Sequence, residues 1–284
     1  MKRILNCCAS DFGQENTSHE LKQAIRDSNG RTLLAEIDGS YITPVKGVTK
    51  AEIASAFGAD LVSLKHFNWR TYEFDGIAYE NPVEEFRRLA GIGVGVNLNV
   101  SPEMGEQFSI SAEAVARVVP LRPDFISLTG YHTPLVTLES TRAAIDLIRE
   151  SFDGLLVVHF VINEARELDT KRYLALVEAG ADAITMPVPG TVPGVTEGRL
   201  LETIDAIHEA GALVSLTTFT SQEGADRDTV REFALSARRA GADIMAFGDA
   251  DTCGMAAPEN LMYASLAMRG KRHTYGRMAR SALR

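Results

Sequence analysis

Polar side chains stand near the ends of several apolar runs in this sequence, where they could meet at one site. The acids Glu36 and Asp38 close the run 32–38, and Asp249 closes the run that begins at Ile244. Comparable positions in other runs hold Lys65, Asn97, Asn99, Thr129 and His159. Side chains alternate across a strand, so residues two apart share a face. We therefore expect one central pocket that combines acids, amides, a lysine and a histidine.

Such a pocket supports more than one chemistry. Glu36, Asp38 and Asp249 are oxygen donors that suit a divalent cation, Mg²⁺ or Mn²⁺, which would polarise a carbonyl or clamp a phosphate. Alternatively, burial could deprotonate Lys65 and make it a Schiff-base nucleophile or a base, with His159 or Glu36 moving protons. In a third interpretation Lys65 and Glu36 are a neutralising ion pair that fills the pocket. The residues alone leave these alternatives open.

Eight strand patterns alternate with eight helical patterns and must position these side chains. The predicted strands are 32–38, 61–67, 94–100, 125–131, 155–161, 183–188, 213–219 and 244–249, and the helices lie at about 49–58, 82–90, 111–119, 137–152, 169–179, 196–210, 226–240 and 258–268. This alternation predicts an α/β protein with a (β/α)8 TIM barrel, with a doubly wound open sheet as the alternative. An extra helix at about 19–28 precedes the first strand. In a barrel, function lies at the carboxyl ends of the strands.

Helix-to-strand corners recur along the chain and support the same fold. The clearest copies are 58–60, 180–182 and 241–243, each Gly-Ala-Asp, with Gly-Ala-Leu at 211–213 and a weaker copy at 122–124. A glycine just past a helix adopts the left-handed conformation that ends it. We expect one domain over residues 1–284, with an N-terminal extension at 1–31, the barrel at 32–268 and a basic tail at 269–284.

The loops after the last three predicted strands have the most distinctive composition. Three prolines and two glycines between 187 and 196 predict a rigid loop. Loops after barrel strands seven and eight often bind phosphate through backbone N–H groups. We therefore expect an anionic substrate, with its phosphate, to contact Thr220, Ser221, Gln222, Gly224, Gly248 and Gly254 together with Asn97, Asn99 and Thr129. The alternative is that these loops are turns selected only to begin helices.

The composition limits the class of partner and the compartment. The formal net charge of −9 argues against a nucleic-acid backbone as the main partner. No stretch approaches the roughly 18 apolar residues of a membrane span, and the three cysteines offer neither a metal pair nor a disulfide framework. A cytoplasmic protein without a membrane partner is expected. The basic stretch 269–284 predicts a last helix packed on the barrel or on a second subunit of a homo-oligomer, or else a rim for an anion.

Several segments resemble an uncharacterised bacterial TIM-barrel family whose members are often catalogued as haloacid-dehalogenase-like hydrolases. They are 1–6 with 10–12, the loop 187–196, and the stretches 220–226, 258–260 and 269–275. The resemblance implies a cytoplasmic TIM barrel and brings no catalytic residue. Asp249 and Asp251 look like the aspartate pair of haloacid-dehalogenase phosphatases. In that superfamily the pair opens the domain, whereas only residues 252–284 follow it here.

These observations predict an enzyme that acts on a small anionic, phosphorylated metabolite by lyase, isomerase or hydrolase chemistry, assisted by a divalent metal. The predicted catalytic residues are Glu36, Asp38, Lys65, His159 and Asp249. One alternative is a catalytically silent barrel that binds a phosphorylated metabolite for regulation. Another is a Schiff-base aldolase that uses Lys65.

Overall fold

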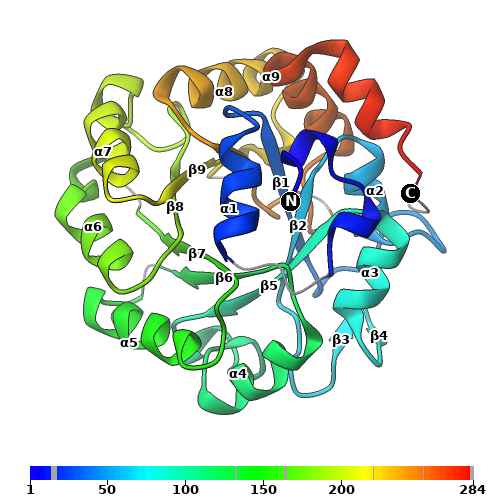
Figure 1. Cartoon of the computed structure of the whole chain (residues 1–284), viewed down its shortest axis with the longest axis horizontal. Helices are drawn as coiled ribbons and strands as arrows, with labels where there is room; N and C mark the ends of the chain where they lie inside the picture. Colours follow the sequence, from blue (N-terminus) through cyan, green and yellow to red (C-terminus); the bar gives the residue numbers. More distant parts are fainter. Residues whose placement is uncertain (14–17, 132, 163–164, 220, 252, 282–284) are drawn as a thin grey trace.

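All eight predicted strands are present in the computed structural model, where they close into one parallel barrel (Figure 1). The structure describes residues 1–13, 18–131, 133–162, 165–219, 221–251 and 253–281. The barrel strands are β1 (Thr32–Asp38), β2 (Leu61–Lys65), β5 (Gly93–Asn99), β6 (Phe125–Gly130), β7 (Leu155–Phe160), β8 (Ala183–Pro187), β9 (Leu213–Thr217) and β10 (Ile244–Phe247). β1 pairs with β10 on one side and with β2 on the other, which closes the barrel. The TIM-barrel prediction is confirmed.

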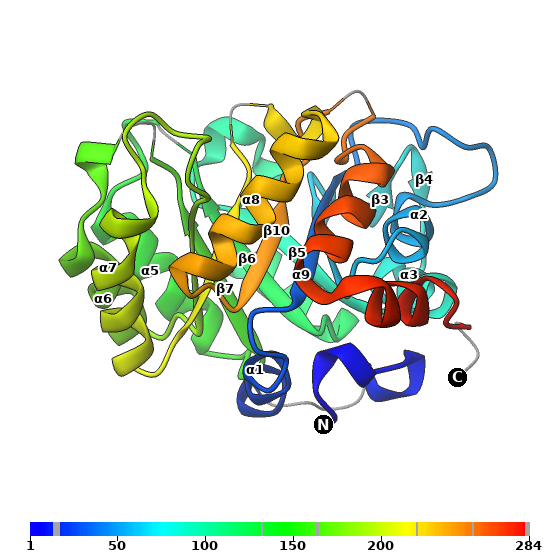
Figure 2. The ribbon, with the colours of Figure 1, turned by 90° about the horizontal axis from the view of Figure 1, so that it is seen from above.

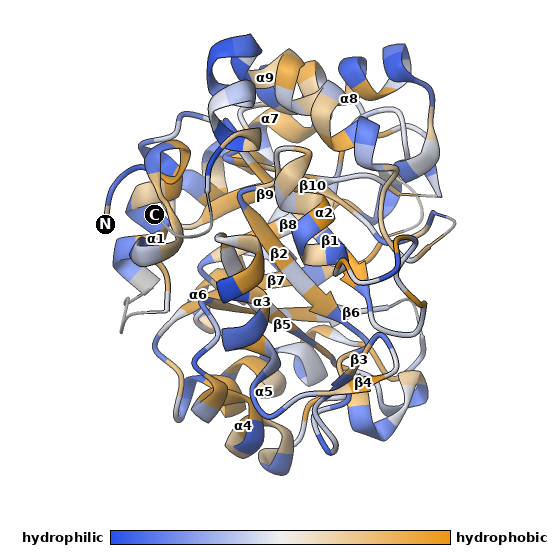
Figure 3. Ribbon diagram, turned by 90° about the vertical axis from the view of Figure 1, so that its right-hand side faces the viewer, coloured by the Kyte–Doolittle hydropathy of each residue, from blue (hydrophilic) through white to orange (hydrophobic). Residues whose placement is uncertain are grey.

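The predicted helices surround the barrel, and in Figure 3 the barrel strands are coloured mostly hydrophobic, whereas the helices alternate between hydrophilic and hydrophobic colouring. They are α2 (Lys50–Ala56), α3 (Pro82–Ala90), α4 (Ala112–Val118), α5 (Leu138–Arg149), α6 (Thr170–Glu178), α7 (Glu197–Glu209), α8 (Arg227–Ala240) and α9 (Pro258–Met278). Short 3-10 helices occupy Ile4–Asn6, Ala9–Asp11, Pro102–Met104, Glu106–Phe108, Val119–Leu121, Ala165–Glu167 and Gln222–Gly224. Side chains of Thr49, Asn81 and Ser111 cap α2, α3 and α4 by accepting backbone N–H groups.

The extra N-terminal helix is present as α1 (Ser18–Arg26) and closes the bottom of the barrel (Figure 2). Leu21 and Ile25 of this helix pack in one buried cluster with the lower lumen residues of the strands. The lumen members are Leu34, Leu61, Phe125, Leu155, Val157, Ala183, Leu213, Ile244 and Ala246. The lower lumen is therefore apolar and sealed, which leaves the opposite, carboxyl-terminal mouth for polar side chains.

A two-stranded hairpin between α2 and α3 was not predicted. Its strands are β3 (Glu73–Phe74) and β4 (Ile77–Ala78), and the turn residues Asp75 and Gly76 have φ of 55° and 74°. Positive φ at both turn positions is the geometry that favours an Asp-Gly turn in a hairpin. The strands are too short for a periodic pattern, so the turn dipeptide was the available indication.

Four aspartates at the helix-to-strand corners fasten neighbouring strands together at the bottom of the barrel. The N–H of Asp60 donates to the Leu33 carbonyl at 2.8 Å, and Asp60 Oδ2 accepts the Leu33 N–H at 2.9 Å. The same two bonds join Asp124 to Val94, Asp182 to Leu156 and Asp243 to Val214. Each aspartate thus satisfies both backbone groups of one residue in the adjacent strand.

Each of these aspartates also contacts a basic side chain from a helix, near the end of α3, α5 or α7 or just before the kink in α9. Arg87 of α3 donates to Asp124 at 3.0 Å, and Arg149 of α5 donates to Asp182 at 2.5 Å. His208 of α7 lies 2.9 Å from Asp243, and Arg269 of α9 donates to Asp60 at 2.9 Å. Each of the three arginines also donates to the carbonyl two residues before its aspartate. We call these four Asp–base units the corner clamps.

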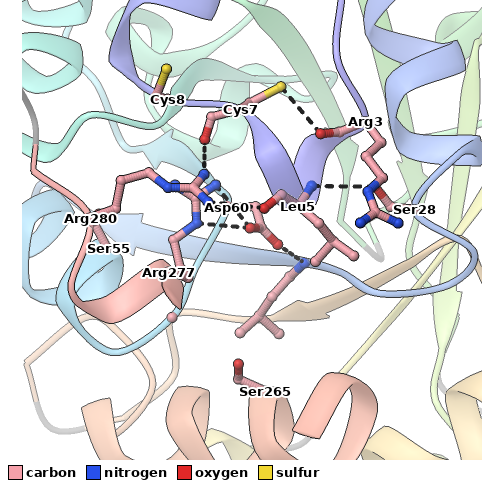
Figure 4. A network of polar contacts seen from close by, with 12 residues as sticks. Arg3, Leu5, Cys7, Cys8, Ser28, Ser55, Asp60, Ser265, Arg277 and Arg280 are labelled. Carbon is pink, nitrogen blue, oxygen red and sulfur yellow. Dashed lines mark hydrogen bonds and ion pairs between the residues drawn. The ribbon is translucent and has the colours of Figure 1, made fainter. Parts of the chain in front are cut away.

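The basic tail takes part in this bottom network. α9 continues past residue 268 to Met278 through a kink at Gly270, whose φ is 67°. Arg277 donates to Asp60 at 3.0 Å, and Arg280 donates to the Cys7 carbonyl (Figure 4). Arg269 and Arg277 are therefore buried structural cations at the end of the barrel opposite its mouth. These arginines thus pack the last helix on the barrel.

No helix in the described ranges is both long and apolar enough to cross a bilayer.

Neutralising one corner clamp is expected to destabilise the barrel strongly. The substitution Asp60→Asn leaves Arg269 and Arg277 as buried cations without a carboxylate, so unfolding in urea should show a loss of about 3 kcal/mol or more. Asp228→Asn is the matched control, because the Asp228 side chain is 69% exposed and its ion pairs should contribute at most about 1 kcal/mol. Equal losses in the two variants would contradict the role of the clamp.

Candidate active site

The mouth of the barrel holds the predicted acids and lysine on adjacent strands. Asp38 at the end of β1 pairs in register with Lys65 at the end of β2, and Glu36 pairs with Ser63 one step lower. These residues share strand faces with Leu34 and Leu61, which belong to the lumen cluster. The alternation predicted from the sequence therefore brings Glu36, Asp38 and Lys65 into the lumen.

Lys65 lies between two carboxylates. Its Nζ is 3.3 Å from Glu36 Oε2 and 2.9 Å from Asp249 Oδ1, and the three side chains are only 7%, 10% and 15% exposed. Nζ also lies 5.4 Å from the centre of the Tyr131 ring. Burial alone would lower the pKa of Lys65, but the charges of Glu36 and Asp249 outweigh burial and hold this pKa well above its usual value. Lys65 is therefore an ammonium ion.

The pKa of Glu36 is also raised, but for a carboxyl group a raised pKa favours the uncharged form, whereas for Lys65 it favours the charged form. Burial is the main cause that raises the pKa of Glu36, and the nearby Asp249 and Glu223 charges act in the same direction, against the lowering effect of Lys65. A carboxyl whose charged form is disfavoured in this way can hold a proton nearer to neutral pH than an exposed glutamate can. Glu36 is thus suited to moving a proton.

His66 joins the site although the sequence did not single it out. It has a left-handed φ of 48°, and its Nδ1 lies 2.9 Å from Asp38 Oδ1. The Ser40 N–H donates to the same Oδ1 at 2.7 Å. Burial opposes ionisation of Asp38, but the contacts with His66 and Ser40 outweigh it and hold the pKa of Asp38 below its usual value. The indication in the sequence was a histidine directly after a lumen lysine.

Asp38, His66 and Asp249 form a group that could hold a metal ion. One ligand atom from each side chain lies within 4.8 Å of the others. The predicted metal set was Glu36, Asp38 and Asp249. Asp38 and Asp249 belong to this trio as predicted. Glu36 instead contacts Lys65, and His66 is the third member of the trio.

The amides predicted to contact substrate lie on the neighbouring part of the lumen wall. Asn97 Nδ2 donates to Thr129 Oγ1 at 2.7 Å, and Asn99 Nδ2 donates to the Phe108 carbonyl at 3.3 Å. The Oδ1 atoms of both asparagines are buried and accept no hydrogen bond from the described residues. Asn97, Asn99 and Thr129 are thus brought together on β5 and β6, with two acceptor atoms left for a ligand.

His159 on β7 faces the same lumen as an uncharged imidazole. Its ring meets the Phe219 ring edge-on at 5.2 Å, and its Nε2 is buried. Burial and the charge of Lys65 lower the pKa of His159 to about 3. A neutral imidazole can donate or accept a hydrogen bond, and it adds no positive charge for an anionic ligand.

The loops after β9 and β10 bring acids against the glycines predicted to bind phosphate. Thr220 lies outside the described residues. Ser221 has a φ of 60° and precedes the 3-10 helix that contains Gln222 and Gly224. A Cβ added to Gly224 would lie 2.9 Å from Asp251 Oδ1, and one added to Gly248 would lie 2.4 Å from Glu223 Oε1. A Cβ on Gly254 would lie 3.0 Å from Asp38 Cβ. Gly224 and Gly248 thus make room for carboxylates, whereas an added Cβ on Gly254 would lie nearest to the Tyr41 ring, at 2.7 Å from Cδ2.

Glu223, which lies between Gln222 and Gly224, is a lumen acid that was not predicted from the sequence. Ala246 belongs to the lumen cluster and Phe247 to the outer core, so Gly248 has lumen parity and the Glu223 carboxyl fills its place. Thr218 Oγ1 donates to Glu223 Oε1 at 2.8 Å. The strand predicted to run to residue 249 is shorter, because β10 ends at Phe247 and Asp249 reaches Lys65 from the following loop.

The closed barrel with a polar mouth defines a TIM-barrel protein whose candidate site lies at the carboxyl ends of the strands. The chain matches the family described as "Domain of unknown function (DUF7916)" over residues 5–284, and it belongs to that family. No curated protein sequence matches the chain.

Solved structures similar to this chain are TIM barrels rather than haloacid-dehalogenase folds. The carboxyl transferase domain of Rhizobium etli pyruvate carboxylase, with pyruvate and biocytin, has a TM-score of 0.56 at 17% identity over 91% of this chain and 50% of that chain. The complete multifunctional pyruvate carboxylase from Rhizobium etli gives 0.55 at 16% identity, over 91% and 29%. The chain thus spans about half the length of that carboxyl transferase domain. At identities this low, the structural similarity shows a shared fold and does not show a shared activity.

Unfolding of the protein should become easier in mild acid because of His159. Its pKa of about 3 in the folded chain is below the ordinary value of 6.5, so unfolding binds a proton between these two pH values. Stability from this group is complete above pH 6.5 and declines as the pH falls, by up to about 1.4 kcal/mol per pH unit. Urea unfolding measured from pH 7 to pH 5 should show a shallower decline for His159→Gln. An unchanged slope would contradict the buried neutral state.

Proposed function

We propose that this chain is an enzyme that acts on a small anionic metabolite at the mouth of the barrel, with a divalent cation held by Asp38, His66 and Asp249. The observation that carries the proposal is the convergence of Glu36, Lys65 and this trio from β1, β2 and the loop after β10. Strand ends at this face of a barrel are where catalytic groups collect. The family description names no substrate, so the proposal rests on this site.

The balance of charge supports a cation. The carboxyl groups of Glu36 and Asp249 contact Lys65, and Asp38 contacts His66 beside them, so the acidic groups outnumber the single ammonium group. Two carboxylates with one imidazole suit Mn²⁺ better than Mg²⁺, which prefers an all-oxygen shell. A bound divalent cation would act as a Lewis acid toward a carbonyl or carboxylate of the substrate.

The chain's own groups supply the remaining functions. Lys65 as an ammonium ion would stabilise negative charge that develops on the substrate, and its raised pKa argues against the alternative of a Schiff-base amine. Glu36 would transfer a proton, because burial favours its neutral form. His159 would donate or accept a hydrogen bond as a neutral imidazole. This set fits lyase or isomerase chemistry on a carbon next to a carbonyl or carboxylate.

The location of the substrate anion follows from the same charges. A phosphate over Gly224 or Gly248 would meet the carboxylates of Asp251 and Glu223, which lie against those glycines. Like charges at this distance repel each other. We therefore place the anion at the cation held by the trio rather than at these two glycines.

Mn²⁺ binding tests the proposed cation. Equilibrium titration followed by electron paramagnetic resonance should show one bound Mn²⁺ for each wild-type chain. The variants Asp38→Asn and Asp249→Asn should bind at least about tenfold more weakly, since each loses one charged ligand. Asp228→Asn, on the exposed surface of α8, is the control and should bind as the wild type does. Binding that is equal in all four proteins would place the cation elsewhere.

The ammonium state of Lys65 has a chemical test. Incubation with pyruvate as a simple carbonyl probe and then with borohydride should add no reduced pyruvyl group to Lys65, because an ammonium ion is not a nucleophile. Peptide mass spectrometry detects the adduct, and Lys65→Arg supplies the blank. An adduct on Lys65 in the wild type, absent from that variant, would support the aldolase alternative instead.

A further inference from the structure

Several buried polar atoms around the upper lumen have no hydrogen-bond partner among the described residues. They are Asn97 Oδ1, Asn99 Oδ1, His159 Nε2, Ser215 Oγ, Thr217 Oγ1 and Glu223 Oε2. Strand register places the asparagines, His159, Ser215 and Thr217 on the lumen wall, and Glu223 fills the lumen position over Gly248. Buried polar atoms without partners destabilise a folded chain unless a ligand or water satisfies them. Their common location indicates a polar ligand.

Two of these atoms, Asn97 Oδ1 and Asn99 Oδ1, can accept a hydrogen bond but cannot donate one. Glu223 Oε2 is likewise only an acceptor when Glu223 is ionised. Asn97 Nδ2 contacts the Ser127 carbonyl at 3.4 Å, and Asn99 Nδ2 contacts the Phe108 carbonyl at 3.3 Å. A carbonyl oxygen cannot donate, so these contacts fix each amide with its nitrogen toward the backbone and its Oδ1 free. Glu223 Oε1 is occupied by Thr218, which leaves Oε2. The site therefore requires donors from its ligand.

The lumen offers little free positive charge for a strongly anionic ligand. Lys65 is neutralised by Glu36 and Asp249. Lys50, the other buried lysine at this end, contacts the Asp38 and Tyr41 carbonyls and lies 2.7 Å from Asp75 Oδ1. A phosphate ester normally requires arginines, lysines or a helix N-terminus directed at it. Within the described chain, the lumen instead presents acceptors.

We propose that the substrate is a hydroxylated carboxylic acid whose hydroxyl groups donate to Asn97, Asn99 and Glu223. Its carboxylate binds the divalent cation, so this part rests on the proposed function. The hydroxyls of Ser215 and Thr217 and the imidazole of His159 complete the wall, since each can donate or accept.

Pairs of acids that differ only in their hydroxyl groups test this proposal. The probes are D-glycerate against propionate and D-gluconate against hexanoate, with inorganic phosphate as a fifth, titrated calorimetrically into wild-type protein with and without MnCl₂. At least one hydroxylated acid should bind about tenfold or more tightly than its partner, because a site built for hydroxyls rejects an analogue that lacks them. Equal binding within both pairs, no binding of either hydroxylated acid, or tightest binding of phosphate would overturn the proposal.

Variants of the amides separate ligand recognition from a structural role. Asn97→Leu and Asn99→Leu should keep the melting temperature of the ligand-free protein within a few degrees, because removal of an unpartnered oxygen offsets the loss of the Nδ2 donor to Thr129 or to the Phe108 carbonyl. Each should also reduce the preference for the hydroxylated acid about tenfold. Asn6→Leu on the exposed N-terminal segment is the control. A lower melting temperature with the hydroxyl preference intact would assign the amides to folding and overturn the proposal.

The two proposals fail in different ways in these titrations. Affinities of both acids in a pair that are unaffected by MnCl₂ and by Asp249→Asn, with the hydroxyl preference intact, would overturn the proposed cation and leave the hydroxylated substrate in place. Mn²⁺ binding by the trio, with no hydroxyl preference in either pair of acids, would overturn the substrate class and leave the cation in place.

Discussion

The double hydrogen bond between a corner aspartate and one residue of the adjacent strand is the constraint on which the barrel depends. It satisfies both backbone groups of that residue and sets the register of the two strands at the bottom of the barrel. A basic side chain compensates the buried carboxylate at every clamp, since a buried charge without a partner would be strongly destabilising. Because strands in a barrel share one register, fixing their lower ends also determines which residues face each other at the mouth. Asp38 meets Lys65 there for this reason.

The bottom and the mouth of the barrel therefore differ in how fully their buried polar groups are hydrogen-bonded. At the bottom, the corner aspartates are matched by donors, and the lumen above them is filled by apolar side chains. At the mouth, amide, hydroxyl, imidazole and carboxylate atoms remain buried without partners. Residues selected only for stability would not leave such atoms unmatched. Thr32 Oγ1 at the start of β1 also lacks a partner among the described residues, but most of the unpartnered lumen atoms lie at the mouth, and this concentration supports the proposed ligand.

Much of this arrangement could be predicted because it depends on local patterns. Periods of two and of about 3.6 residues, with caps such as Thr49 and Asn81, located the strands and helices, and alternation placed Glu36, Lys65 and Asn97 in the lumen. The features that were not predicted depend on the exact residue at which a strand ends and on side chains that reach the lumen from loops distant in the sequence. Asp249 reaches Lys65 only because β10 stops at Phe247, and Glu223 enters the lumen because Gly248 has no side chain. His66 faces Asp38 through a left-handed backbone, which is uncommon for any residue other than glycine and so was not expected at this position.

The corner clamps differ in how much chain separates their two charged partners. His208, Arg149 and Arg87 lie 35, 33 and 37 residues from their aspartates, whereas Arg269 and Arg277 lie 209 and 217 residues from Asp60. During synthesis on a ribosome, the three local clamps can form as soon as their own βα units have emerged. The Asp60 clamp must wait for the last helix. The first strands thus lack this clamp until α9 has been synthesised, so we expect closure of the ring to be a late step in folding of the barrel.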